Sequence, residues 1–229
     1  MRTEYSNWRK LDNAALAFPL VTGENDTRVF RFYCQLKEEV DSDILQQALD
    51  RTMEKYPLFQ AVLRKGLFWF YLEHSHIRAL VKPETEPPCS RLYIPDKKSL
   101  LFQVSYYKER INFEVFHALT DGTGAMHFLQ ELVQNYLILA HPKENFPEIG
   151  RDKKTGRGNI EEDSFSQYYS SDIPKNREKK KAAVKLKGEK LVHSDMHISE
   201  VVLSVKEIHQ KARSYGVSIT VLLDRKSVV

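Results

Sequence analysis

The residues most able to do chemistry in this chain lie in the stretch FEVFHALTDG, positions 113–122. His117 ends a run of alternating apolar residues, and Asp121 and Gly122 follow four and five positions later. A histidine at the end of a strand presents its imidazole at the rim of a sheet, and a free imidazole titrates near neutral pH. Such a group suits a general base that removes a proton from a hydroxyl, thiol or amine during acyl transfer.

The Asp-Gly pair suggests how the loop that carries His117 is held. Asp121 can accept backbone N–H bonds or pair with an arginine. Gly122 permits a positive φ or the close approach of another backbone. The structural alternative is an exposed histidine beside an ordinary Asp-Gly turn, and these residues alone leave both interpretations open.

The elements that must position this stretch can be read from apolar spacing. Alternation predicts strands at 27–38, 59–66, 67–74 and, on either side of a polar turn at 108–110, within 100–119. Lys65-Gly66 is expected to join the second and third of these as a hairpin. Helical spacing predicts helices over 43–56 and 123–140, the first capped by Ser42 or Asp43 and ended by Pro57.

The composition changes after residue 140. We expect 1–140 to form one domain, 141–192 a mobile basic crossover, and 193–229 the start of a second domain. Within 174–190 stand eight Lys/Arg and two Glu, so the rest of the chain carries 27 basic residues against 29 acidic ones. This basic run lacks interleaved aromatic residues and an apolar stripe, so it is interpreted as a solvated linker, and the folded body is not predicted to bind nucleic acid.

The last part of the chain resumes a regular pattern. It predicts a strand at 197–205 and a helix at 206–216 stopped by Gly216. A further apolar helix, capped by Ser218, is expected to end before residues 224–229. The apolar residues of this region are patterned for burial, and we expect them to pack back onto the first domain or to mediate self-association.

Bulk composition excludes several classes of protein. With 41% apolar and 11% aromatic residues the chain can bury a core. No apolar run reaches the roughly 20 residues that span a bilayer, and the N-terminus lacks the apolar centre of a signal peptide. Cys34 and Cys89 are expected to be reduced thiols of a cytoplasmic protein. His74 and His76 would share a strand face, but no third ligand is apparent, so no metal is expected.

The pattern HALTDG, set between a strand and an amphipathic helix, resembles the HxxxDG motif of the chloramphenicol acetyltransferase-like superfamily. Condensation domains of peptide synthetases, plant BAHD acyltransferases and alcohol acetyltransferases belong to it. WRKLDNAALAFP and DILQQALDRTMEKYPLFQAVL look like the N-terminal half of its condensation and alcohol-acetyltransferase branch. SVKEIHQKARSYGVSITVLL looks like the start of that family's second half. The resemblance implies an α/β, two-layer sandwich with a mostly antiparallel or mixed sheet, of which only one half is complete here.

The resemblance also implies roles for individual residues. His117 matches the catalytic general base, Asp121 the structural aspartate that braces the loop, and Gly122 the glycine that leaves room beside the channel. Many members have a second histidine before the catalytic one, where this chain has Phe116. An exposed histidine contributes little packing, so we expect His117→Ala to leave folding nearly unchanged.

The implied reaction moves an acyl group from acyl-CoA or an acyl-carrier thioester to an alcohol or amine, with no permanently bound cofactor. Family members of this layout are about twice as long, so we expect the truncated second half to impair activity. The alternative function is a catalytically inactive fragment or binding module that retains the fold. A missing C-terminal half or further copies of the chain are the expected macromolecular partners.

Overall fold

The computed structural model describes residues 8–24, 26–67, 69–147 and 200–228. The chain divides into two compact units, Met1–Tyr169 and Ser170–Val229. The predicted crossover 141–192 lies almost entirely outside the described residues, as does the boundary between the units.

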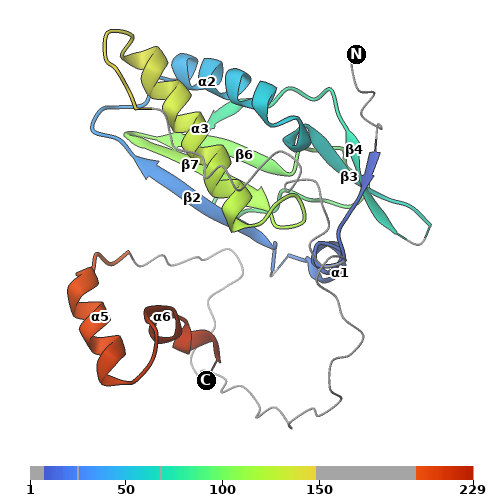
Figure 1. The fold of residues 1–229 in the computed structure, drawn as a ribbon. Helices are drawn as coiled ribbons and strands as arrows, with labels where there is room; N and C mark the ends of the chain where they lie inside the picture. Colours follow the sequence, from blue (N-terminus) through green and yellow to red (C-terminus); the bar gives the residue numbers. More distant parts are fainter. Residues whose placement is uncertain (1–7, 25, 68, 148–199, 229) are drawn as a thin grey trace, which may run out of the picture. The chain divides into compact units, whose positions relative to one another are not determined.

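Two sheets form the frame of the first unit (Figure 1). The larger sheet has the order β2-β7-β6-β5 and consists of β2 (Val29–Gln35), β5 (Val81–Pro83), β6 (Phe102–Tyr107) and β7 (Arg110–Phe116). Its strands pair antiparallel except β5 with β6, which are parallel. The smaller sheet, order β1-β4-β3, consists of β1 (Trp8–Lys10), β3 (Ala61–Lys65) and β4 (Phe70–His74).

Helices α2 (Ser42–Lys55) and α3 (Gly122–Ala140) lie side by side across one face of the larger sheet (Figure 1). Pro57–Phe59 forms a 3-10 turn after α2, and the short helix α1 (Ala17–Val21) precedes β2. The predicted sandwich of helices on a mixed, mostly antiparallel sheet is confirmed.

The core between the helices and the sheet is built on stacked phenylalanine rings. Phe128 of α3 lies 4.4 Å from Phe59 and 4.7 Å from Phe113, centroid to centroid, and both pairs are stacked. Phe113 and Phe128 are fully buried. Because these rings come from α3, β7 and the turn after α2, burying them ties the strand that leads to His117 to the helix that follows it.

In the second unit the structure describes two helices, α5 (Val205–Ser214) and α6 (Ile219–Val228). Ser204 Oγ accepts the N–H of Glu207, and Ser218 Oγ accepts that of Val221, so each helix begins at a serine, as predicted at Ser218. Gly216 has φ +66°, and α5 ends two residues before it. The sequence predicted Ser218 as a cap and Gly216 as a stop because helix caps and stops depend on local residues.

Three expectations about elements were wrong. Residues 200–204 form no strand, since a strand needs a neighbour and none pairs with them among the described residues. Helix α6 runs on through 224–228 instead of ending before them. Asp41, rather than Ser42 or Asp43, caps α2 by accepting the N–H groups of residues 43 and 44. The apolar side chains of 201–203 are exposed within their unit, and the expectation that this region packs onto the first domain or mediates self-association stays a prediction.

Candidate functional site

His117 follows directly on β7 and is held to the neighbouring strand through its backbone. Its N–H donates to the carbonyl of Arg28 at 2.9 Å, one residue before β2 begins. Glu114, three residues earlier, stands opposite Arg31 in the register of these two strands. The antiparallel pairing therefore fixes the position of the His117 backbone at the end of both strands.

The imidazole is half-buried between two aromatic rings, so the expectation of an exposed side chain was wrong. Phe18 of α1 stacks on it with centroids 4.3 Å apart and planes 10° apart, and Phe30 of β2 lies tilted at 4.8 Å. Among the described residues neither ring nitrogen of His117 has a hydrogen-bond partner, so ring packing and not a hydrogen bond positions the imidazole. The two phenylalanines fix the ring plane without occupying its nitrogen atoms.

Asp121 is the N-cap of α3. Its Oδ1 accepts the N–H of Gly124 at 2.8 Å, and its carbonyl accepts that of Ala125 at 3.0 Å. The carboxylate thus satisfies a backbone donor of the first turn, which is the first of the two modes that the sequence suggested. No arginine pairs with it in the part of the chain that the structure describes.

Gly122 does not have the backbone geometry that the sequence suggested. Gly122 is the first residue of α3, and its φ is not positive. A Cβ placed on it would meet only the ring of Phe32, at 3.9 Å. Gly124 is the tighter position, because a Cβ there would lie 2.1 Å from Oγ1 of Thr120. An ordinary contact at Gly122 does not test the role implied by the family resemblance, and that role stays a prediction.

Phe116 stands where many family members have another histidine, and here its environment is apolar. The side chain is fully buried and stacks on Tyr93 at 5.4 Å. A histidine at this position would lose hydration without gaining a partner, which accounts for an apolar residue.

The other histidines do not form a second reactive cluster. His76 lies beyond the end of β4, so it does not share a strand face with His74, although their rings contact edge to face at 5.4 Å. His127 lies on α3, where its carbonyl accepts the hydroxyl of Tyr56. Nowhere in the described ranges do three or more His, Cys, Asp or Glu side chains gather as a metal site would require.

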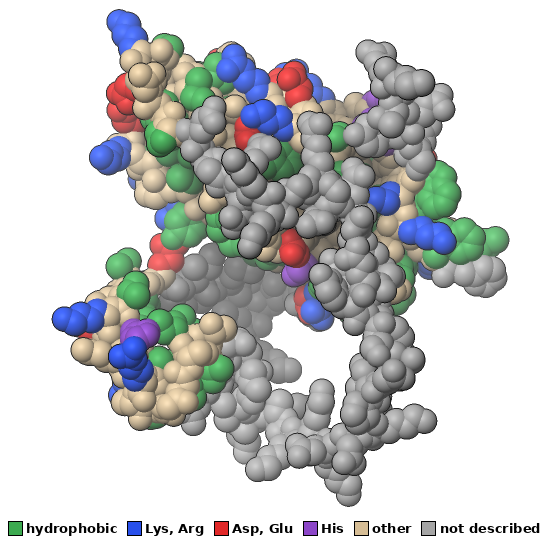
Figure 2. Space-filling model, in the orientation of Figure 1, with side chains coloured by type: hydrophobic (Ala, Val, Ile, Leu, Met, Phe, Trp, Pro, Cys, Tyr) green, Lys and Arg blue, Asp and Glu red, His purple; other side chains and the backbone are tan. Residues whose placement is uncertain are grey.

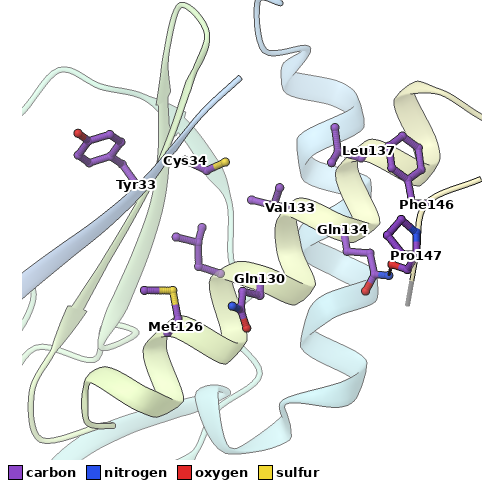
Figure 3. Close-up of a pocket in the computed structure, with 10 residues that line it drawn as sticks. Tyr33, Cys34, Met126, Gln130, Val133, Gln134, Leu137, Phe146 and Pro147 are labelled. Atoms are coloured by element: carbon purple, nitrogen blue, oxygen red, sulfur yellow. Dashed lines mark hydrogen bonds between the residues drawn. The ribbon is translucent and has the colours of Figure 1, made fainter. Parts of the chain in front are cut away.

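An apolar pocket of about 370 Å³ opens between β2 and α3 (Figure 3). It is lined by Tyr33, Cys34, Met126, Leu129, Gln130, Val133, Gln134, Leu137, Phe146 and Pro147. Gln134 Nε2 donates to the carbonyl of Pro147, which holds the chain after α3 against the pocket. The volume is at the small end of the range for ligand sites, and the lining suits an aliphatic or aromatic group.

The pocket and the histidine are linked by one face of β2. Phe30 contacts the His117 ring, Phe32 lies beside Gly122, and Cys34 lines the pocket, so alternate residues of the strand face α3. Burial raises the pKa of the Cys34 thiol, so this group is a neutral part of the lining at neutral pH. An apolar group could therefore bind on the same face of β2 as the candidate base.

An ion-pair network on the opposite face of the sheet stabilises the same strands. Arg31 pairs with Glu84 and with the almost fully buried Glu114, whose carboxylate also accepts the N–H of Cys89 at 2.6 Å. Burial lowers the pKa of the Arg31 guanidinium, but its bonds to Glu84 and Glu114 raise it more, so the group stays charged. The network ties the segment after β5 to the strands that carry His117.

Sequence reasoning found the histidine and its capping aspartate but missed their surroundings. Phe18 and Phe30 were not recognised, because ring stacking on a histidine depends on tertiary structure and has no local pattern. Gly124 was passed over in favour of Gly122. The sequence TDGTG did contain the signal, since the third residue of a capped helix lies against its capping loop.

Comparison with known proteins gives a class of fold and no closer family. No family model matches the chain, and no curated protein matches it. The structure is similar to solved condensation domains.

One such structure is the starter condensation domain of the rhizomide synthetase RzmA, with a TM-score of 0.50 and 12% identity, over 63% of this chain and 40% of that one. A variant of that domain in complex with C8-CoA matches with a TM-score of 0.50 and 11% identity, over 59% of this chain and 37% of that one. The chain therefore has the condensation-domain fold and spans less than half the length of these domains.

Proposed function

We propose that this chain carries the histidine-bearing part of an acyltransferase that moves an acyl group from a thioester to an alcohol or amine. The observation that supports it best is the placement of His117, at the end of a strand and before an aspartate-capped helix, within a condensation-domain fold. The donor would be acyl-CoA or an acyl carrier, and a cytoplasmic location remains part of the proposal.

In the proposed reaction one nitrogen of His117 takes the proton of the acceptor hydroxyl or amine. The acceptor atom then forms a bond to the thioester carbonyl carbon, the carbon–sulfur bond breaks, and the thiolate leaves with the proton returned by the imidazole. Phe18 and Phe30 would hold the ring plane during both transfers. The remaining walls of such a site would come from protein beyond the described residues.

The test is release of free thiol from C8-CoA with a panel of alcohols and amines, using the longest form of the protein that contains this chain. His117→Ala should lower the rate about 10²–10⁴-fold. His127→Ala is the matched control, because that side chain lies on the next helix and has no place in the proposed reaction. An equal loss in both variants, or an unchanged rate in His117→Ala, would contradict the assignment.

The second candidate function is a binding module without turnover, and the apolar pocket between β2 and α3 favours it. In that case an aliphatic probe such as octanoate should bind with the same affinity to the wild type and to His117→Ala. Val133→Phe, which would fill the pocket, should abolish this binding. Thiol release that depends on His117 would decide against this candidate.

A further inference from the structure

The tip of the β3–β4 hairpin is apolar although it is exposed. Leu67 is 88% exposed and Trp69 53% exposed. The N–H of Gly66 donates to the carbonyl of Trp69 at 2.7 Å, which closes the loop tightly. Tight hairpin loops favour Asn, Asp and Gly, so apolar residues here serve neither the turn nor the core.

Basic side chains surround this tip. Lys65 is the last residue of β3, and Lys10 and Arg64 stand on either side of Tyr71 in the register of the smaller sheet. The one acidic residue of these three strands is Glu73, which pairs with Arg64 at 3.2 Å. The hairpin therefore combines an apolar end with a net positive charge.

The hairpin extends past the helices of the first unit (Figure 1), and apolar and basic side chains gather at its end (Figure 2). A projecting end of this kind offers too little area for a stable protein interface, which buries about 800 Å² on each partner. Binding to a bilayer needs no large contact area, because single apolar side chains can insert into it and its anionic headgroups attract the flanking cations.

We propose that the β3–β4 hairpin docks on an anionic membrane surface, with Leu67 and Trp69 entering the headgroup region and Lys10 and Lys65 facing the phosphates. Tryptophan suits this depth, since its indole has an apolar body and an N–H donor. Among the described residues none of the helices has the length and apolar character to cross a bilayer.

The test is co-sedimentation of the full chain with vesicles of phosphatidylcholine alone and of phosphatidylcholine with phosphatidylserine. We expect binding to the anionic vesicles, and a loss of about tenfold or more in the double variant L67S/W69S. Leu80→Ser is the matched control, since Leu80 is 55% exposed outside the hairpin, and it should bind as the wild type does. Lys10→Glu combined with Lys65→Glu should weaken binding to anionic vesicles and reduce its dependence on salt.

A fluorescence measurement keeps the proposal falsifiable if the double variant folds poorly. The chain has two tryptophans, so Trp8→Phe leaves Trp69 as the sole reporter. Its emission should shift to the blue on adding anionic vesicles. An unshifted emission, absence of vesicle binding, or full binding by folded L67S/W69S would overturn the proposal. Full binding by the folded double variant would mean that vesicle binding resides elsewhere in the chain. If vesicles leave the Trp69 emission unchanged but a protein partner shields this residue, the tip is a protein contact.

Discussion

Helix α3 of the first unit and helix α6 of the second begin in the same way but differ in the burial of their apolar side chains. Asp121 caps α3 and Ser218 caps α6, each by accepting one N–H of the first turn. Yet Phe128 and Leu132 of α3 are fully buried, whereas Val221 and Leu223 of α6 are 51% and 58% exposed. A side-chain cap marks where each helix begins, but burial of its apolar side chains needs facing elements, which for α3 are the larger sheet and α2.

The largest expected effect comes from removing a ring that the sheet covers. Phe128→Ala should lower the free energy of unfolding by about 3–5 kcal/mol, because it leaves a cavity among the stacked rings. Leu223→Ala should change it by less than about 0.5 kcal/mol. Urea unfolding followed by tryptophan emission and far-UV circular dichroism measures both, and similar losses would show that the apolar face of α6 is covered.

The stability cost of losing an ion pair should show the same contrast between buried and exposed side chains. Arg31→Ala leaves Glu114 buried without its cation and should cost about 3 kcal/mol. Arg28, one residue before the same strand, is the matched control, since its partner Asp26 is exposed, and Arg28→Ala should cost less than about 1 kcal/mol. Thermal unfolding of the two variants at low and high salt would separate them. A salt-sensitive loss of equal size in both would mean that the network is no stronger than a surface pair.

The sequence predicted the elements whose signal is local. The core of the fold, β6, β7, α2 and α3, followed from apolar periodicity, and Gly216 and Ser218 from backbone and capping preferences. The three-residue strands β1 and β5 were missed, since each exists by pairing with a longer neighbour. Residues 200–204 show the converse, because their strand-like pattern pairs with no strand in the described part of the chain and forms none itself.

The candidate site divides in the same way. His117 and Asp121 were found because their spacing lies within one strand–turn–helix unit. The rings of Phe18 and Phe30 reach His117 from other elements, so only the fold could reveal them. Their contact also changes the expectation for His117→Ala, which should now lower the melting temperature measurably by removing the stacked ring.

A smaller effect is expected from the cap itself. Asp121→Ala removes the acceptor of the Gly124 N–H and should cost about 1 kcal/mol. Asp121→Asn keeps an oxygen in the same place, so its stability should stay within a few tenths of a kcal/mol of the wild type. Ser204→Ala removes the corresponding cap of α5 and serves as the comparison in the second unit. Melting curves test the stability of all three, and thiol release tests whether Asp121→Asn also keeps activity. A folded Asp121→Asn without turnover would place the carboxylate in the chemistry.

The smallest effect should distinguish the two glycines of the first turn of α3. Gly122→Ala meets only the Phe32 ring at ordinary contact distance, so it should be neutral or slightly stabilising, as alanine favours helices. Gly124→Ala forces the Thr120 hydroxyl to rotate, and we expect the strain to cancel that gain and to cost up to about 1 kcal/mol. The double variant Gly124→Ala with Thr120→Ala removes the clashing oxygen and should recover the loss. Failure to recover would mean that Gly124 is required by the backbone of the capped turn and not by the space beside Thr120.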